Sequence, residues 1–346
     1  GIDAGAALVM TSFNTVNGIP ATGNKKLMRG ILRDEMGFDG VLISDWAAIE
    51  ETIYHGYCAD KEDAAIRAVE AGVDIDMMTG IYCDNLCRLV REGKIPESLV
   101  DECCMRILEL KNKLGLFENP YKDADEEKEQ QLILCKEHRE LAREAARKSF
   151  VLLKNEEQIL PLDKTKKTAF IGPYVNSRNL MGSWSIIGEA KDITTVEEIM
   201  AVEEAGNNVV CCQGSPMLGA EVILEGFTEE NQATYTPEEE AKMLEEALEA
   251  AKKADQVVLF IGEDRLQSGE ATSNATIQIP QIQQNLLERV AEINENIAVV
   301  LFSGRPLDLR DVQVKAKAIL EVWMPGTEGA GAITDVLYGR YNPTGK

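Results

Sequence analysis

Histidine, basic side chains and long apolar runs are all scarce in this sequence, and each shortage excludes a class of function. Lys and Arg number 36 against 59 Asp and Glu, a formal net charge of −23, which argues against binding a phosphate backbone. No apolar run approaches the ~20 residues of a membrane helix. Neither nucleic acid nor a membrane is therefore expected as a partner. With 45% hydrophobic residues in 346, the composition is that of a globular protein of about two domains.

Metal ligands are also few. The only histidines are His55 and His138, and the eight cysteines include no Cys-x-x-Cys spacing. Cys83 and Cys87 are four residues apart, as on one helix face, but a zinc site needs about four ligands. We expect buried, structural thiols, with no metal and no other cofactor. Free thiols in a chain too long to need disulfides favour a reducing compartment, hence a cytoplasmic location. A periplasmic or secreted location stays open, because residues 1–10 do not resemble a natural N-terminus.

Short apolar runs alternate with helical periods along the first third of the chain. Strands are predicted at 7–10, 41–44 and 73–77, and helices at 26–36, 64–71, 82–93 and 97–114. The alternation lacks hairpin signals, so it predicts parallel strands joined by right-handed crossovers. Polar residues around Pro120 mark a domain boundary.

The second half repeats the alternation after one long charged helix over 126–148. Strands are predicted at 149–153, 168–171, 208–212, 256–261, 297–302 and 318–323, and helices at 237–254, 280–294 and 328–337. The middle strands are continuous apolar, β-branched runs, which are typical of parallel sheets covered on both faces.

A carboxylate follows one buried strand directly. Asp45 ends the run Gly40-Val41-Leu42-Ile43-Ser44 and precedes Trp46. Reactive groups of parallel β/α folds gather at the carboxyl ends of strands. An Asp in that position also serves commonly as the N-cap of the next helix. The spacing alone leaves both interpretations open.

Several spaced blocks resemble glycoside hydrolase family 3, and they extend over essentially the whole chain. They are VMTSFN at 9–14, NGIPA at 17–21, LRDEMGFDG at 32–40, ISDW at 43–46, AGVDIDM at 71–77, KLGLF at 113–117, SFVLLKN at 149–155, GSWS at 182–185, GRPL at 304–307, GTEG at 326–329 and YNPTGK at 341–346. The branch of the family that they resemble most is the bacterial β-glucosidases of the periplasmic type.

The resemblance implies an α/β protein with a (β/α)8 barrel followed by an α/β sandwich. Residues 1–118 would be the C-terminal portion of the barrel, 119–160 a linker and bridging helix, and 161–346 the sandwich domain. Only three barrel strands are predicted where eight are needed, so we expect an internal fragment of a larger enzyme. Such a fragment would associate with the missing barrel half or with another copy, and alone would have little activity.

The resemblance also assigns the catalytic pair. The Asp of the Ser-Asp-Trp motif, here Asp45, would be the nucleophile. Glu270 would be the general acid/base, because GEATSN at 269–274 followed by IQIP at 277–280 resembles the family's acid/base loop. Gly269 and Asn274 depart from the commoner His and Arg of that loop. A retaining hydrolase needs such a pair roughly 5–5.5 Å apart, and Glu270 would have a pKa raised by burial near Asp45.

Secondary sugar contacts are expected at Met10, Phe13, Trp46 and Ser183. Phe13 stands where many members have Tyr, and Trp46 is either a stacking platform for the sugar or a core residue. Trp184 is expected in the core, and His55 is expected to be structural.

The implied activity is that of a retaining, exo-acting β-glucosidase acting on a β-glucoside or an oligosaccharide. A β-xylosidase of the same family and an inactive sugar-binding remnant remain as alternatives. Family members that use a His acid/base are disfavoured, since neither histidine lies in a matching loop. A dinucleotide site at Gly326, Gly329 and Gly331 is disfavoured as well, because the glycine spacing and the acidic residue about 20 positions on are missing.

Overall fold

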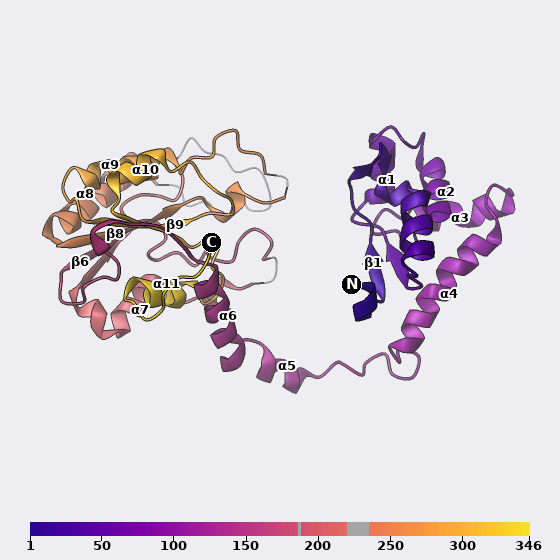
Figure 1. Cartoon of the computed structure of the whole chain (residues 1–346), viewed down its shortest axis with the longest axis horizontal. Helices are drawn as coiled ribbons and strands as arrows, with labels where there is room; N and C mark the ends of the chain where they lie inside the picture. The colour runs from indigo at the N-terminus through magenta and orange to yellow at the C-terminus, as the bar shows by residue number, and fades with distance from the viewer. Residues whose placement is uncertain (186–187, 220–234, 271) are drawn as a thin grey trace. The chain divides into compact units, whose positions relative to one another are not determined.

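The chain divides into two compact units in a computed structural model that describes residues 1–185, 188–219, 235–270 and 272–346. Unit 1 is Gly1–Glu126 and unit 2 is Glu127–Lys346 (Figure 1). Within the described ranges, no helix is long and apolar enough to cross a membrane. Each unit has its own hydrophobic core.

Unit 1 contains one parallel strand pair and one small hairpin. Strands β1 (Leu8–Met10) and β4 (Val41–Ile43) pair in parallel, while β2 (Thr15–Val16) and β3 (Ile19–Pro20) pair antiparallel. The prediction of no hairpins is therefore wrong. Asn17 and Gly18 form the turn with φ of 53° and 79°, and Asn-Gly is the residue pair that such two-residue turns favour.

The third predicted strand of unit 1 is also absent as a strand. Residues 73–77 contact β4 through a single parallel bridge between Ile43 and Ile75. The reason is Asp74, whose Oδ2 accepts the Leu42 amide at 2.8 Å, so that a side chain takes the place of a ladder carbonyl. The carboxylate in the predicted strand was the signal for this irregularity.

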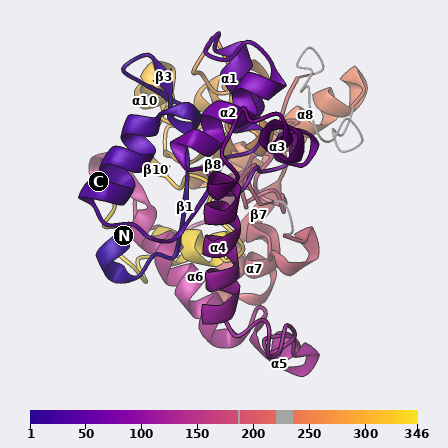
Figure 2. The same ribbon diagram turned by 90° about the vertical axis from the view of Figure 1, so that its right-hand side faces the viewer.

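Helices cover one side of this strand pair. They are the π-helix η3 (Lys26–Glu35), α1 (Ala48–Tyr54), α2 (Lys61–Ala71), α3 (Ile81–Arg91) and α4 (Glu97–Lys113), with short 3₁₀ turns at η1 (Ile2–Ala4) and η2 (Ala21–Gly23). Figure 2 shows α4 running lengthwise along the unit. Their apolar faces pack against Val9 and Leu42. Cys58 and Cys103 are buried here, but Cys83, Cys87 and Cys104 are exposed, which corrects the expectation of buried thiols.

Two helices occupy the region predicted as one. Helix α5 (Glu126–Leu132) ends before Leu134, whose φ is 54°, and α6 (Lys136–Ser149) begins after it. A residue at positive φ cannot continue a right-handed helix. Helix α6 packs against α11 (Gly329–Leu337), where Arg143 forms a two-point ion pair with the buried Asp335, at 2.7 Å for each hydrogen bond.

Unit 2 is built on a six-stranded sheet in the order β5-β10-β9-β8-β6-β7. Its strands are β5 (Val151–Asn155), β6 (Thr168–Ile171), β7 (Val209–Cys212), β8 (Gln256–Gly262), β9 (Ile297–Phe302) and β10 (Ala318–Glu321). The pairs from β7 to β10 are parallel, as the alternation predicts. The edge strand β5 is antiparallel to β10.

Helices cover both faces of this sheet. The remaining elements are α7 (Val196–Val202), α8 (Pro237–Lys253), α9 (Gln281–Ala291), α10 (Arg310–Lys315), and the 3₁₀ turns η4 (Glu156–Gln158), η5 (Ala190–Asp192), η6 (Glu204–Asn208) and η8 (Arg265–Gln267). Helices α8, α9 and α10 lie on one face, and α6, α7 and α11 on the other (Figure 1). Alternate residues of β8 enter the two cores: Val257, Leu259 and Ile261 enter one, and Val258 and Phe260 the other. The continuous apolar run of β8 is thereby explained.

Candidate functional site

Asp45 follows β4 at the carboxyl end of the parallel pair, in a segment fixed by its neighbours. The Ser44 amide donates to the Ile75 carbonyl at 2.9 Å, and the Met77 amide donates to the Ser44 hydroxyl at 2.8 Å. The Ala47 amide then donates to the Met77 carbonyl at 3.2 Å. Buried Ser44, before the carboxylate, and Ala47, after it, are thus both bonded to one neighbouring segment, residues 75–77. The preorganised backbone suits a catalytic group.

The N-cap interpretation of Asp45 is wrong. Helix α1 is capped by Ala47, which has φ of 56° and makes no side-chain capping bond. The half-buried Asp45 side chain instead accepts the Trp46 amide on Oδ1 at 2.6 Å. This bond orients the carboxylate at the strand end without placing it over a helix terminus.

Three apolar side chains predicted to contact sugar lie near the same strand ends. Met10 ends β1, directly beside Ile43 in the register, and is 48% exposed. Phe13 follows β1 and is 37% exposed, and Trp46 is 60% exposed. The core alternative for Trp46 is therefore wrong within unit 1. Exposed aromatic and Met side chains beside a carboxylate are what a pyranose ring requires on its apolar face.

Glu270 lies in unit 2, in the connection between β8 and α9, and is exposed. Near it, the Thr272 hydroxyl donates to the Gly269 carbonyl at 2.8 Å. Ala271, within the predicted acid/base motif, lies outside the described residues.

Ser183 lies against Gly269, the residue before Glu270. A Cβ at Gly269 would lie 2.3 Å from the Ser183 hydroxyl oxygen, and Gly269 has φ of 128°. Both the space and the backbone angle require glycine there, which explains the departure from the commoner His. Trp184 is 68% exposed, so its predicted place in the core is wrong.

Sequence reasoning missed a polar cluster at the carboxyl ends of β8, β9 and β10. Glu263 and Glu321 are buried, and Arg305 forms an ion pair with Glu263 at 2.5 Å. Burial raises the pKa of Glu321 to about 7, against hydrogen bonds from Trp323 and Ser303. The signal was present in the sequence, because Glu263 and Arg305 follow predicted apolar strands and Glu321 is the one charged residue within another.

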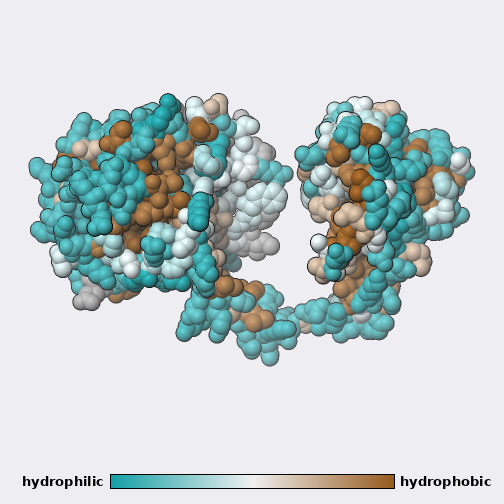
Figure 3. Space-filling view, in the orientation of Figure 1, coloured by the Kyte–Doolittle hydropathy of each residue, from teal (hydrophilic) through white to brown (hydrophobic). Residues whose placement is uncertain are grey.

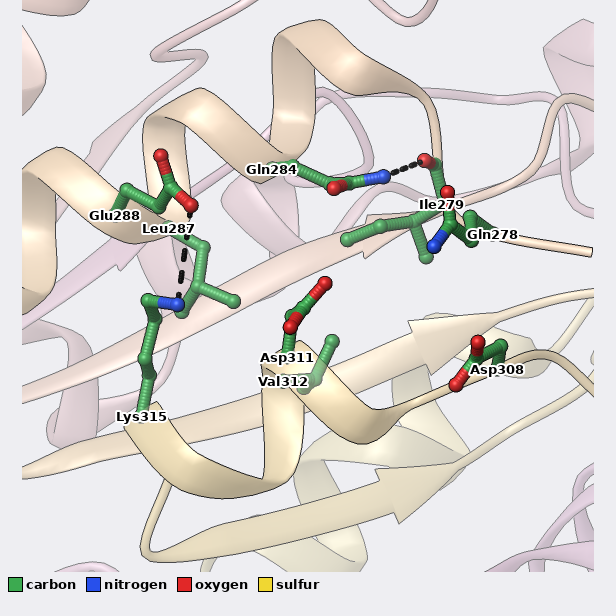
Figure 4. Close-up of a pocket in the computed structure, with 9 residues that line it drawn as sticks. All are labelled: Gln278, Ile279, Gln284, Leu287, Glu288, Asp308, Asp311, Val312 and Lys315. Carbon is green, nitrogen blue, oxygen red and sulfur yellow. Dashed lines mark hydrogen bonds and ion pairs between the residues drawn. The ribbon is translucent and has the colours of Figure 1, made fainter.

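A pocket lies between α9 and α10, on the face of the sheet that these helices cover (Figure 4). Glu288 of α9 pairs with Lys315 of α10 at 3.8 Å, and the Gln284 side chain donates to the Ile279 carbonyl at 2.7 Å. Because it contains none of the predicted site residues, we do not assign it to the candidate site. Among the described residues, no group of three or more His, Cys, Asp or Glu side chains is arranged to hold a metal ion.

Comparison with known proteins gives the context of these residues. A periplasmic β-glucosidase of Salmonella typhimurium is 39% identical over 352 residues, which are 100% of this chain and 46% of that protein. A β-xylosidase of Formosa agariphila is 32% identical over 99% of the chain and 47% of its own length. The crystal structure of a Listeria innocua β-glucosidase superposes with a TM-score of 0.87 at 41% identity, over 99% of this chain and 44% of that one. The chain thus spans less than half the length of each.

The family descriptions that match the sequence divide it in the same order as the two units. Residues 1–110 match the glycosyl hydrolase family 3 N-terminal domain. Residues 150–346 match the glycosyl hydrolase family 3 C-terminal domain. With matches to both domains and an α/β fold on a six-stranded sheet, the chain belongs to glycosyl hydrolase family 3.

Proposed function

We propose that this chain forms part of a retaining, exo-acting β-glycosidase that removes terminal β-D-glucosyl residues. The observation that supports it most is the exposed Met10, Phe13 and Trp46 around the strand-end Asp45, in a chain whose relatives include enzymes named β-glucosidases. Parallel β/α proteins place their reactive groups at such strand ends.

In the proposed reaction, Asp45 and Glu270 divide the work of two displacements. The Asp45 carboxylate attacks the anomeric carbon while the Glu270 carboxylic acid protonates the departing oxygen, and the glycosidic bond breaks to leave a glycosyl ester on Asp45. Glu270, now a carboxylate, takes a proton from water as the water oxygen attacks the anomeric carbon. The ester bond breaks, Asp45 is regenerated, and the sugar leaves with its original configuration.

The architecture proposed for this reaction is a (β/α)8 barrel followed by an α/β sandwich. Residues 1–118 would supply the C-terminal portion of the barrel, 119–160 the connection and 161–346 the sandwich domain. What supports a larger assembly is that the strand face carrying Leu8 and Met10 is exposed in unit 1 and that the relatives are longer than this chain. The barrel would be completed by further polypeptide or by another copy of the chain. The cytoplasmic location also stays a prediction.

A β-xylosidase is the second candidate, because one of the relatives is named as such. Aryl β-glucosides and aryl β-xylosides distinguish the two by kcat/KM. The assay uses the 346-residue chain alone and the same chain preceded by the N-terminal portion of the Listeria innocua relative. Turnover in only the second form would support the completed barrel.

Two variants test the roles of the carboxyl groups. Asp45→Asn should lose turnover on every substrate, because an amide does not attack the anomeric carbon as the carboxylate does. Glu270→Gln should lose turnover on methyl β-glucoside but retain much of its kcat/KM on 2,4-dinitrophenyl β-glucoside, whose leaving group needs no proton. Sugar binding without turnover in both forms of the protein would contradict the proposal and favour a binding function.

A further inference from the structure

The loop that carries Glu270 is tied to the sheet by one arginine. Arg305, in the connection between β9 and α10, donates from Nη2 to the Glu263 carboxylate at 2.5 Å and from Nε to both carboxylate oxygens at 3.2 and 3.3 Å. The same Nη2 also donates to the Gln267 carbonyl at 3.3 Å. One guanidinium therefore joins the end of β8 to a residue three positions before Glu270.

Glu263, to which Arg305 binds, is itself held in place by burial and by backbone hydrogen bonds. The residue is fully buried, its amide donates to the Phe302 carbonyl at 2.9 Å, and its carbonyl accepts the Tyr174 hydroxyl. A second buried acid, Glu321, lies close enough for the charge of Glu263 to oppose its ionisation. Arg305 supplies the opposing positive charge at this edge of the sheet.

The next two residues, Ser268 and Gly269, also contact neighbouring segments of unit 2. A Cβ at Gly304 would lie 1.8 Å from the Ser268 hydroxyl oxygen, so Ser268 rests on the backbone beside Arg305. Gly269 then touches Ser183, as described above. Three successive residues thus contact fixed neighbours immediately before Glu270. Earlier in the loop, Asn179 donates to Asp264 at 2.9 Å.

We propose that Arg305 is a positioning residue for Glu270, and this rests on the acid/base function proposed above. By joining buried Glu263 to the Gln267 carbonyl, Arg305 fixes the loop from which the Glu270 carboxyl reaches the glycosidic oxygen. A lysine ammonium is a single point charge on a flexible chain and does not reproduce the planar fork that serves both acceptors. The Arg305 fork thus determines how well the proton donor is placed, without touching the substrate.

The consequence is a defect confined to proton transfer. General acid catalysis contributes ~10²–10⁴-fold, and it depends on geometry. A loosened loop should therefore slow substrates whose leaving group needs a proton and spare those that leave unaided. A general loss of folded protein would slow both equally.

The test compares Arg305→Lys with the matched variant Arg289→Lys, in whichever form of the protein the assay above finds active. Arg289 is exposed on α9 and pairs with Glu292 at 3.3 Å. Arg305→Lys should lower kcat/KM on methyl β-glucoside about tenfold and on 2,4-dinitrophenyl β-glucoside by less than about twofold. Arg289→Lys should match the wild type in each respect.

A second readout needs no activity. Amide hydrogen exchange over residues 264–270 of the 346-residue chain should be faster in Arg305→Lys than in the wild type, and unchanged in Arg289→Lys. Glu263→Gln keeps the shape of the acceptor, and its amide exchange over residues 264–270 should also be faster than in the wild type, but by less. This second variant keeps the test valid if Arg305→Lys does not fold.

The outcomes distinguish the positioning role of Arg305 from the acid/base role of Glu270 on which it rests. If Glu270→Gln affects both leaving groups equally, the acid/base role of Glu270 is wrong and positioning by Arg305 falls with it. If Glu270→Gln behaves as expected while Arg305→Lys leaves leaving-group dependence and exchange unchanged, the Arg305 proposal alone is overturned. Equal losses on both substrates with unchanged exchange would overturn it as well.

Discussion

Units 1 and 2 share the same alternation of strands and helices, but they differ in how many faces of their strands are buried. In unit 2, alternate residues of β8 enter two separate cores, one on each face of the sheet. In unit 1, Val9 enters a core while its neighbours Leu8 and Met10 are 44% and 48% exposed. Brown side chains show at the surface of unit 1 over β1 in Figure 3. A parallel strand pair with one bare apolar face is an incomplete sheet.

The difference bears on how each proposed carboxyl group is supported. The frame around Glu270 consists of buried Glu263, Arg305 and Gly304, all within unit 2. The backbone around Asp45 is fixed on one side, through Ser44 and Met77. We therefore expect unit 2 to be autonomous and unit 1 to depend on further polypeptide for both stability and catalysis.

Separating the units should give the largest effect. Residues 127–346 expressed alone should unfold cooperatively on heating, because both faces of their sheet are covered. Residues 1–126 alone should bind a hydrophobic dye and lack a cooperative transition, since their strand face has no cover. Circular dichroism melts and dye fluorescence measure both. A sharp cooperative melt of residues 1–126 would contradict the proposed dependence.

Each unit also has a buried aspartate that is paired with arginines. Removing the charge of this aspartate should cause the next largest loss of unfolding free energy. Asp74 pairs with Arg33 and Arg106 through side chains only 8% and 14% exposed. Asp74→Asn leaves both arginines without their buried partner, a loss of ~3–5 kcal/mol. In unit 2, Asp335 pairs with arginines 27–35% exposed, so Asp335→Asn should lose about 1–3 kcal/mol.

Hydrogen exchange resolved by segment measures both variants in the intact chain. The two losses should be confined to their own units, since each network lies within one core. For Asp335, burial opposes ionisation, but Arg143, Arg340 and Arg147 outweigh it and lower the pKa below 3.8. Its contribution to stability should therefore be present above pH 4 and lost as the pH falls through the lowered pKa. Equal losses in the two variants would contradict the ranking.

The pH dependence of unit 2 should have a smaller component from Glu321. Burial raises the pKa of this carboxyl from 4.5 to about 7, so between those values the folded chain binds a proton that the unfolded chain has released. Stability should fall as the pH rises through this window, by at most about 3 kcal/mol. Glu321→Gln should show a flatter stability profile from pH 5 to 8 in denaturant titrations.

The matched control for this measurement is Glu245→Gln on α8, where the side chain is exposed. Its stability should follow the wild-type profile across the same range. If Glu321→Gln also follows that profile, the buried cluster at the strand ends does not titrate as expected.

The sequence predicted unit 2 better than unit 1, and the cause is burial. The limits of β6 and β9 agree with the predicted runs, because a strand covered on both faces is apolar throughout. In unit 1 the pattern mixes polar and apolar residues. There Asp74 bonds to the Leu42 amide and interrupts a predicted strand. The break between α5 and α6, at the start of unit 2, was missed because it depends on the single residue Leu134 at positive φ.

For the candidate site, the sequence located the side chains but not their supports. Asp45 was found as a strand-end carboxylate, and the family motif led to Glu270. The link from Arg305 to Gln267 joins a guanidinium to a backbone carbonyl 38 positions away, and no local spacing encodes such a contact. Trp184 was misplaced because an aromatic residue in an apolar context is commonly buried.

The smallest effect on stability should be that of Met10→Ala in unit 1, measured against the same substitution at Met200 in unit 2. Met200 on α7 is 4% exposed and Met10 on β1 is 48% exposed. Met200→Ala should cost about 2–5 kcal/mol of unfolding free energy, while Met10→Ala should cost less than about 0.5 kcal/mol. Urea denaturation of the 346-residue chain, followed by exchange in each unit, measures both. Because Met10 is a proposed sugar contact, its variant should nevertheless raise KM in an active form, so a loss of binding without a loss of stability separates contact from packing. A cost at Met10 close to that at Met200 would mean that the chain already covers its own strand face.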